Sequence, residues 1–406
     1  MHYHNFSNGI TLLGEPIPHV KSAAFSILFP AGSAYENDGL EGTASILSEM
    51  FHKGAGSYSN RDLSEAFEAI GAHRNHSAGI EAISFSGVLL GENIEKVLEL
   101  YATVIRQPTL PESELEVLKS LALQELDALE DEPSSKVMVE LSKQFFPHPF
   151  GRSPYGTKEG IEAITINSIK DFYKTRFQPN NCIIGVSGFY DWDRLVACIE
   201  KNFGDWTGSS TVIDTAILST ESKNKHLQQD TSQVQIAFAL PSVSIDSPDY
   251  YVARVANGVL SGGMSGRLFI EVREKRGLVY RVSASHSGTK GRAALMAYAG
   301  TTPDNANETF NVMRNEIIKL KDGVSEEELT RSKTDLKARL IMQGESTSAR
   351  ASSIASDWWN LKRVRTLDEI KNAIDAVTSA DIEKLFADAD TLPITLVTLG
   401  PKGLEI

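Results

Sequence analysis

Cysteine is scarce in this chain, and its scarcity argues against a fold built on disulfides. Only Cys182 and Cys198 occur among 406 residues. One lies in a strand-like apolar run and the other on the face of a predicted helix. Small secreted domains that depend on disulfides carry many cysteines at close spacing. The chain is therefore compatible with a reducing compartment.

Long apolar runs are also lacking. Nowhere do eighteen apolar residues follow one another, as a membrane-spanning helix would need. The first residues, MHYHNFSNGITLL, have neither the basic segment nor the long apolar segment of a secretory signal. We therefore predict a cytoplasmic protein with no membrane partner, unless a leader has been removed.

Basic residues are outnumbered by acidic ones, 40 against 53, which gives a formal net charge of -13. This balance argues against nucleic acid as a partner. A phosphate-binding loop is missing as well, because no Gly-Lys-Ser/Thr follows the glycines of Ser261–Gly266. The acidity is typical of a chain that stays soluble, and it would also suit a chamber that attracts basic peptides.

The chain is long enough for two domains, and it contains an internal repeat. A hydrophobic content of 41% over 406 residues is ample for two packed cores. Leu110–Leu115 and Val324–Leu329 each begin a long predicted helix. At nearly the same offset, Ala163–Tyr173 matches Ala376–Phe386, and each carries a threonine placed to cap the following helix. The repeat indicates two homologous domains.

Strand and helix patterns mix within each half. Ala23–Phe29 and Val234–Leu240 are strand patterns near the start of the halves, and Cys182–Ser187 and Ile394–Leu399 are strand patterns at their ends. Helical patterns lie between them. This predicts an α+β fold of two homologous domains, each a mixed, mostly antiparallel sheet with helices packed on one face.

The domain boundaries follow from a polar stretch without periodicity. We place an N-terminal domain at residues 1–208, a linker at 209–228 and a C-terminal domain at 229–406.

The most informative stretch is Gly262–Ala284, which reads GGMSGRLFIEVREKRGLVYRVSA. Glycines open it, a short helical pattern ends at Gly277, and a strand pattern resumes. By spacing alone, Arg273 is a basic residue that the dipole of the helix favours, and Tyr280 is a half-buried tyrosine on a strand.

This stretch resembles, nearly residue for residue, the C-terminal signature of the pitrilysin/insulinase family of inverted-zincin metallopeptidases, in the branch of mitochondrial processing peptidase and small bacterial homologues. The resemblance covers essentially the whole chain. In that family the matching arginine and tyrosine reach across a chamber to the zinc site, where they hold the peptide and the developing oxyanion. The resemblance therefore gives Arg273 and Tyr280 catalytic roles. Gly262 and Gly263 are suited to a close backbone approach by an extended peptide.

The zinc motif of the family is degenerate here. Family members carry His-x-x-Glu-His on a helix, where two histidines bind zinc and the glutamate activates water. The stretch Gly42–Gly54 keeps flanking residues of that motif, but Ser45 and Glu49 stand at the histidine positions and Ser48 at the glutamate position. Serine is a poor zinc ligand because its hydroxyl stays protonated, and it cannot replace a carboxylate base. We therefore expect no metal in this chain.

Glu125 matches the third zinc ligand of the family. With no histidines beside it, we interpret it as a solvated residue of an acidic helix. Glu49 and Glu125 could in principle hold a hard cation such as magnesium or calcium. A replacement zinc site at His73 and His76 is disfavoured, because the two side chains would point to opposite faces of a strand.

Asn75 and Glu81 match a strand pattern of the family, Asn-Ala-x-Thr-x-x-Glu, although His76 replaces the alanine and Ala78 the threonine. In the family this strand lies beside the substrate, so the resemblance makes Asn75 and Glu81 substrate-binding residues. An edge strand protected by polar side chains explains the segment equally well.

An intact arginine–tyrosine pair beside a degenerate zinc motif favours a subunit over a complete enzyme. Some family members work as pairs in which one chain supplies the zinc helix and the other the arginine–tyrosine pair. The resemblance therefore implies a non-zinc subunit of a heterodimeric zinc metallopeptidase, inactive alone and acting on peptides. Its partner would be a homologous subunit with an intact His-x-x-Glu-His and the zinc.

Two alternatives stay open. The first is a catalytically inactive homologue that binds peptides, or scaffolds a complex, without a partner enzyme. The second is a homodimer with an unconventional metal of its own.

Overall fold

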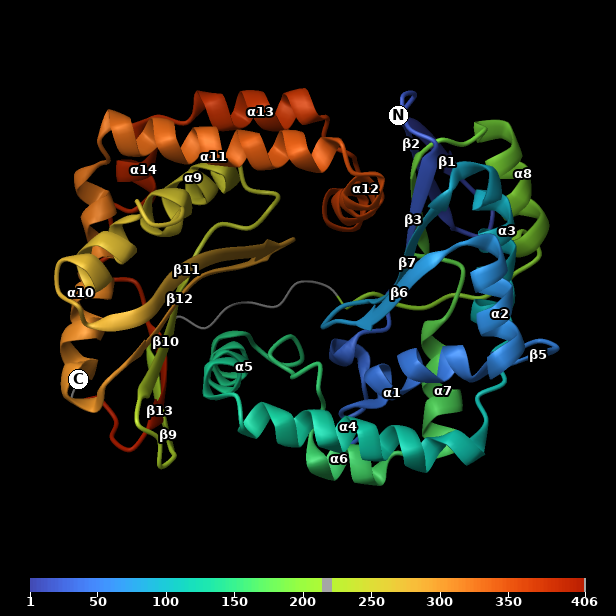
Figure 1. Cartoon of the computed structure of the whole chain (residues 1–406), viewed down its shortest axis with the longest axis horizontal. Helices are drawn as coiled ribbons and strands as arrows, with labels where there is room; N and C mark the ends of the chain where they lie inside the picture. Colours follow the sequence, from blue (N-terminus) through green and yellow to red (C-terminus); the bar gives the residue numbers. More distant parts are fainter. Residues whose placement is uncertain (214–220, 405–406) are drawn as a thin grey trace. The chain divides into compact units, whose positions relative to one another are not determined.

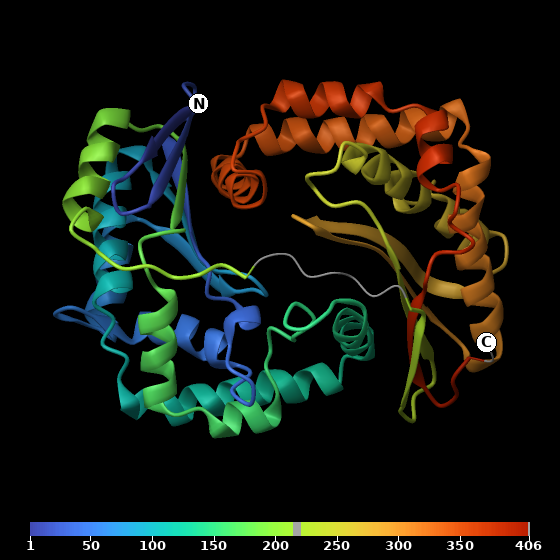
Figure 2. The same ribbon diagram turned by 180° about the vertical axis from the view of Figure 1, so that it is seen from behind.

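The fold comes from a computed structural model, which describes residues 1–213 and 221–404 (Figure 1 and Figure 2). These residues form two compact units. The first comprises residues 1–128, 148–213 and 343–364, and the second comprises residues 129–147, 221–342 and 365–404. The predicted linker at 209–228 includes residues 214–220, which lie outside the described residues.

A six-stranded mixed sheet forms the centre of the first unit (Figure 1). Its strand order is β1-β2-β8-β3-β7-β6, in which β2 and β8 are parallel and the other neighbours antiparallel. The strands are β1 His2–Asn5, β2 Thr11–Pro16, β3 Ser22–Phe29, β6 His73–Ala78, β7 Ile83–Leu90 and β8 Ile183–Gly188, and a separate ribbon pairs β4 Gly54–Ala55 with β5 Tyr58–Ser59. Strand β6 lies at one edge of the sheet.

The helices of the first unit that belong to the N-terminal half are α1 Thr43–Met50, α2 Asn60–Ile70, α3 Ile94–Arg106, α4 Leu115–Glu130, α6 Lys158–Ala163, α7 Ile166–Arg176 and α8 Trp192–Phe203. Helix α3 shows why they form a core. It buries Ile94, Val97, Leu98 and Tyr101, the spacing that places residues on one face of a helix. The fully buried ring of Tyr101 lies 5.0 Å from that of Phe25 on β3.

The second unit is built in the same way on a five-stranded sheet of order β11-β12-β10-β13-β9, in which only β13 and β9 are parallel. Its strands are β9 Lys223–Gln228, β10 Val234–Pro241, β11 Val279–Thr289, β12 Arg292–Thr301 and β13 Thr395–Gly400. Its helices from the C-terminal half are α9 Tyr250–Ser261, η5 Phe269–Glu274 (a π-helix), α10 Ala306–Ile318, α11 Glu326–Gly344, α13 Leu367–Ala376 and α14 Ser379–Leu385. Strand β11 lies at one edge of this sheet.

Each half of the sequence also contributes one helix to the other unit. Helix α12 Thr347–Leu361, from the C-terminal half, packs on β3 and β8 of the first sheet. An added Cβ at Gly185 of β8 would lie 2.6 Å from the carbonyl oxygen of Ala351, so only glycine allows this approach. Helix α5 Pro133–Phe145, from the N-terminal half, packs on the second sheet, and Leu141 and Phe145 join its apolar cluster.

The predicted fold class is confirmed: two α+β units carry mixed, mostly antiparallel sheets with helices. The predicted threonine caps are confirmed as well, because Thr165 accepts a hydrogen bond from Ser168 N and Thr378 accepts one from Asp381 N. The exchanged helices are a feature that the sequence analysis did not anticipate. The domain boundaries at residues 208 and 229, which were placed from the sequence, stay a prediction.

Among the residues that the structure describes, none of the helices combines the length and the apolar composition needed to cross a bilayer.

Candidate functional site

Helix α1 carries the three degenerate motif positions. Ser45 is half-buried, Ser48 is only 2% exposed, and Glu49 is exposed. Ser45 and Glu49 are four residues apart and therefore lie on one face of the helix. The Ser48 hydroxyl is buried and has no hydrogen-bond partner among the described residues.

A buried carboxylate holds the start of α1. The Oε1 atom of Glu36 accepts hydrogen bonds from the backbone N–H groups of Gly42 and Ala44, at 3.1 and 2.8 Å. These groups have no partner within the helix, so an acidic side chain there caps it. Burial raises the pKa of Glu36 to about 7, and its Oε2 has no partner among the described residues. Glu36 was not among the residues predicted from the sequence, where its only signal is an acidic residue shortly before a helix.

Helices α1 and α4 line a pocket of about 350 Å³, which we call the α1–α4 pocket. Ser45 and Glu49 contribute from α1, and Glu125 contributes from α4. The apolar part of its lining includes Ile46, which is buried, and Leu121, which is half exposed. The structure thus brings together the residues that resemblance placed at three zinc-ligand positions.

Zinc does not fit the residues of this pocket. Hydroxyls and carboxylates replace the histidines that such a site needs. Within residues 1–213 and 221–404, no group of three or more histidine, cysteine, aspartate or glutamate side chains is arranged to hold a metal ion. Calcium takes six to eight oxygen ligands, and Glu49 and Glu125 would supply only part of such a set.

Glu49 already has a partner of its own. Its carboxylate lies 3.0 Å from His76 Nε2 on β6. This hydrogen bond lowers the pKa of Glu49. The His76 ring lies 4.0 Å from the His52 ring, and Arg74 lies 2.6 Å from His52 Nδ1. Burial lowers the pKa of His52 to about 3, so this ring is neutral and Arg74 donates to it.

Exposure alternates along β6. His73 and Asn75 are exposed, whereas His76 is half-buried. The two histidines therefore lie on opposite faces, as predicted. Asn75 stands on the edge strand of the first sheet, and Glu81 follows in the turn after it. The Oε2 atom of Glu81 accepts a hydrogen bond of 3.4 Å from Trp359 Nε1 of α12.

Arg273 and Tyr280 lie together in the second unit. The guanidinium carbon of Arg273 is 5.0 Å from the centre of the Tyr280 ring and 4.9 Å from that of the Phe269 ring. We call this arrangement the Arg273–Tyr280 stack. The attraction between a cation and two ring faces holds the guanidinium in place. The sequence analysis missed Phe269, whose signal was its position four residues before Arg273 on one helix face.

Two irregular backbone features produce this stack. Arg273 lies in the π-helix η5, where Lys275 N donates to Ile270 O at 2.9 Å. Such wide turns are rare and often occur at functional sites. The register of β11 against β12 shifts between Val279 and Arg281. This bulge leaves Tyr280 without a partner in the ladder, and bulges redirect side chains. Tyr280 is 80% exposed.

The charge of Arg273 is not neutralised within the described residues. None of the hydrogen bonds or ion pairs found there involves its guanidinium, and its contacts are those with the two rings. The nearby carboxylate of Glu271 pairs with Lys275 and Arg276 instead. Arg273 can therefore bind an anionic or carbonyl group from a ligand.

The two predicted glycines differ in their surroundings. An added Cβ at Gly262 would meet Gly258 O at 2.3 Å, so the packing of α9 by itself requires glycine there. Gly263 has a φ of +96° and nothing within 4 Å of an added Cβ. The loop after α9 is open at Gly263.

Two family models match the chain. Residues 13–158 match the family described as Insulinase (Peptidase family M16), and residues 163–336 match the one described as Peptidase M16 inactive domain. The chain therefore belongs to the insulinase, or M16, peptidase family, which is zinc-dependent. This confirms the resemblance to the pitrilysin/insulinase family.

Related sequences match along their whole length. The chain is 28% identical over 400 residues to "Uncharacterized zinc protease YmxG" of Bacillus subtilis (strain 168), and the match covers 98% of this chain and 97% of the relative. It is 27% identical over 406 residues to "Uncharacterized zinc protease" of Rickettsia felis, with the same coverage.

Solved structures share the fold. A peptidase M16 inactive domain from Pseudomonas fluorescens superimposes with a TM-score of 0.88 at 20% identity, covering 100% of this chain and 99% of that one. A protease from Helicobacter pylori gives 0.89 at 20% identity, covering 98% and 99%. A chain of complex III2 from Candida albicans gives 0.84 at 21% identity, covering 98% and 96%. At these identities the likeness shows the fold alone.

Proposed function

We propose that this chain is the non-zinc subunit of a heterodimeric zinc metallopeptidase, to which it supplies Arg273 and Tyr280. One observation carries the proposal. Arg273 is a fixed guanidinium with no acidic partner among the described residues, and it is stacked on the exposed ring of Tyr280. A fold gains little stability from an unpaired charge, so we assign the pair to ligand binding.

The chemistry of the pair fits peptide cleavage. Arg273 would stabilise negative charge that develops on the scissile carbonyl oxygen, and the Tyr280 hydroxyl would donate a hydrogen bond to it. Removing one such donor from enzymes costs about 3 to 4 kcal/mol of transition-state stabilisation. The donors gain their effect by being in place before the reaction begins.

The rest of the reaction would come from the partner subunit. Ser48 stands on α1 where a general base is needed, with its hydroxyl buried, and the donors that line the α1–α4 pocket do not suit zinc. A homologous subunit with an intact His-x-x-Glu-His would hold the zinc, which supplies an activated water. We expect this chain to be inactive alone and place the complex in the cytoplasm.

Peptide would bind along open backbone edges. Strand β6 has a neighbour on one side only, and a peptide can add to such an edge by main-chain hydrogen bonds. Asn75 on this strand and Glu81 after it would contact the peptide, as would the loop at Gly262 and Gly263. The same edge supports the alternative function, an inactive homologue that binds peptides or scaffolds a complex without a partner enzyme.

Isolation of the complex tests the proposal. The tagged chain is purified from its native cells, any equimolar companion is identified, and the pair is assayed on a quenched fluorescent peptide. We expect a homologous companion with an intact His-x-x-Glu-His, and cleavage that a chelator stops and that neither chain performs alone. Self-association alone, with calorimetric peptide binding, would instead support the alternative. Stoichiometric zinc in the isolated chain would support the homodimer.

A further inference from the structure

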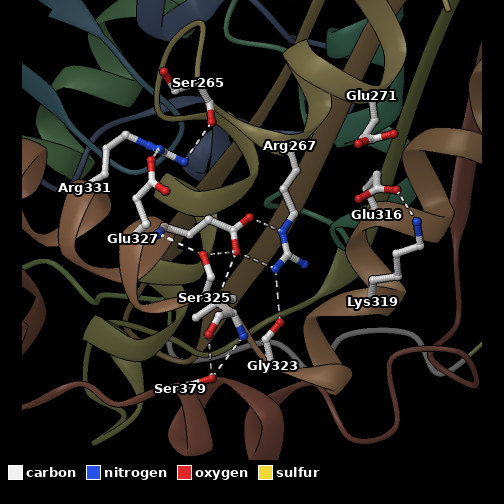
Figure 3. A network of polar contacts seen from close by, with 12 residues as sticks. Ser265, Arg267, Glu271, Glu316, Lys319, Gly323, Ser325, Glu327, Arg331 and Ser379 are labelled. Carbon is white, nitrogen blue, oxygen red and sulfur yellow. Dashed lines mark hydrogen bonds and ion pairs between the residues drawn. The ribbon is translucent and has the colours of Figure 1, made fainter. Parts of the chain in front are cut away.

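A partly buried ion pair ties the segment before Arg273 to helix α11 (Figure 3). Arg267 donates through Nε to Oε1 of Glu328 at 2.6 Å and through Nη2 to Oε2 at 2.8 Å. Its Nη2 also donates to the carbonyl oxygen of Gly323 at 3.1 Å. The two side chains are only 16% and 19% exposed. The arginine thus holds three acceptors near the start of α11.

Glu328 is fixed from its own side as well. Its Oε2 accepts hydrogen bonds from Ser325 N and Ser325 Oγ, at 2.9 and 3.1 Å. The hydrogen bond from Arg267, followed by the backbone N–H of Ser325, lowers the pKa of Glu328 to about 2. The carboxylate therefore stays ionised at every pH near neutrality, and its direction is set by α11.

A second arginine of α11 reaches the same segment. Arg331 donates through Nη2 to the carbonyl oxygen of Ser265 at 3.0 Å, two residues before Arg267 (Figure 3). Arg331 is itself paired with Glu327 one turn earlier. The backbone at residues 265–267 is therefore tied to α11 at two points.

The loop before this segment is exposed. Gly263 lies in open space at positive φ, and Met264 is 74% exposed. The buried side chains of Leu268 and Val272 hold the segment against the core, but such apolar contacts are not directional. A two-pronged arginine–carboxylate bond is directional. The ion pair is thus a directional contact that fixes the tilt of the segment against α11, together with the hydrogen bond from Arg331 to Ser265 O.

Stability does not explain a pair buried to this degree. Desolvation of two charges offsets most of their attraction, and apolar replacements of buried pairs are often neutral or stabilising. What the arginine provides is a planar fork that matches a carboxylate in one orientation only, which lysine cannot reproduce.

We propose that Arg267 and Glu328 are positioning residues, which set the direction in which the Arg273 guanidinium and the Tyr280 ring are presented to a ligand. Arg273 follows Arg267 by six residues, or at most roughly 9 Å of helix, because the α-helical rise of 1.5 Å per residue is an upper limit for the wider turns of η5. A tilt of about 10° at Arg267 would then move the guanidinium by roughly 1.5 Å. Misplacement by about 1 Å can lower a catalysed rate about 100-fold. The catalytic consequence of this inference rests on the proposed function, whereas the geometric part does not.

Two conservative variants test the proposal. Arg267→Lys keeps the positive charge and loses the planar guanidinium that makes two parallel hydrogen bonds. Glu328→Gln keeps the shape of the side chain and loses its negative charge. Arg339→Lys is the matched control, because its exposed pair with Asp335 lies on the same helix and away from the segment. Each variant is made with and without 3-fluorotyrosine labelling, and the Tyr280 fluorine resonance is assigned by its loss in Tyr280→Phe.

We expect the Tyr280 resonance of the isolated chain to shift or broaden in both test variants and to stay in place in Arg339→Lys. In the assembled pair, kcat should fall roughly 10- to 100-fold in Arg267→Lys with KM little changed. An unchanged Tyr280 resonance together with a lower melting temperature would make the ion pair purely structural and overturn the proposal. Because the resonance needs no partner, this result is distinct from a failure of the proposed function, in which Arg273→Ala would leave turnover unchanged.

Discussion

The α1–α4 pocket and the Arg273–Tyr280 stack differ in how their charges are balanced. In the pocket, Glu49 is paired with His76, and nearby Glu36 accepts two backbone hydrogen bonds from the start of α1. In the stack, Arg273 has aromatic neighbours and no anion among the described residues. Glu49 is thus engaged within the chain, and the other carboxylate of the pocket, Glu125, is exposed to solvent on α4. The Arg273 guanidinium is instead held against two rings and pairs with no carboxylate of the described residues, so it is the charge that an anionic or carbonyl group of a ligand can meet.

The largest expected effect comes from placing the two histidines of the zinc motif on α1, which should turn the α1–α4 pocket into a zinc site. The double variant Ser45→His, Glu49→His places two imidazoles on the helix face that shares the pocket with Glu125, which is the ligand set of a zinc site with an open position. We expect about one equivalent of zinc by elemental analysis and a melting temperature that rises with added zinc. Adding Glu125→Gln should reduce zinc binding. Absence of zinc from the double variant would show that the helix frame of the motif has not been kept.

Glu36→Gln should change the pH dependence of stability. The folded pKa of Glu36 is about 7, against an ordinary value of 4.5. The folded state therefore holds this proton more tightly, and its contribution to stability is complete below about pH 4.5 and is lost as pH rises through 7. A shift of this size corresponds to roughly 3 kcal/mol. The glutamine variant should thus be more stable than the parent at pH 8, by up to about 3 kcal/mol, and much closer to it at pH 5.

Urea unfolding at the two pH values measures this difference. All four tryptophans, Trp192, Trp206, Trp358 and Trp359, lie in the first unit with Glu36, so their fluorescence reports on that unit. Equal effects of the substitution at pH 5 and pH 8 would show that Glu36 does not titrate in this range.

Tyr280→Phe, in the Arg273–Tyr280 stack, should lower the turnover of the assembled pair, whereas Ser48→Ala, on α1, should not. The phenylalanine variant keeps the ring that stacks on Arg273 and loses the hydroxyl, so kcat of the assembled pair should fall roughly 100- to 1,000-fold. The free energy of unfolding of Tyr280→Phe should stay within about 0.5 kcal/mol of the parent's, because the side chain is 80% exposed.

Ser48→Ala should leave the turnover of the assembled pair unchanged. A loss of turnover in Ser48→Ala would place part of the chemistry on this chain's own helix α1.

His76→Ala should have the smallest effect. The contact between the His76 ring and the Glu49 carboxylate is about half exposed on the Glu49 side, and exposed polar pairs contribute less than about 1 kcal/mol. Because the pKa of Glu49 is lowered in the folded state, its contribution is present at neutral pH and disappears in acid. Denaturant unfolding of the variant and the parent at pH 7 and at pH 3 should show a small difference that vanishes at the lower pH. A loss of several kcal/mol would mean that the histidine has a larger structural role.

Much of the fold could be predicted because local patterns carry it. Short apolar runs mark β3 and β10, which are buried along nearly their whole length, and the threonines at 165 and 378 cap their helices within three residues. The exchange of α5 and α12 could not be predicted, because an apolar helix face does not by itself indicate on which sheet it packs. The choice is made by contacts such as that of Gly185 with Ala351, which are more than a hundred residues apart.

The candidate site also divides into features that a sequence motif predicts and features that depend on the three-dimensional structure. Arg273 and Tyr280 were found through a motif in which they are seven residues apart. The features that join them, a π-turn and a β-bulge, have no signature in composition or periodicity. Glu36 was missed for a related reason, since its burial depends on the packing around it, including Arg152 from a distant loop.

The most direct test of the account is the turnover of the assembled pair with Arg273→Ala in this chain. We predict that kcat/KM falls roughly 100- to 1,000-fold, an effect of about 3 to 4 kcal/mol, while the fold and the affinity for the partner stay unchanged. Arg276→Ala, which breaks only the neighbouring pair with Glu271, should cleave the peptide at close to the parental rate. Parental turnover in Arg273→Ala would contradict the claim that this chain contributes to catalysis in the complex.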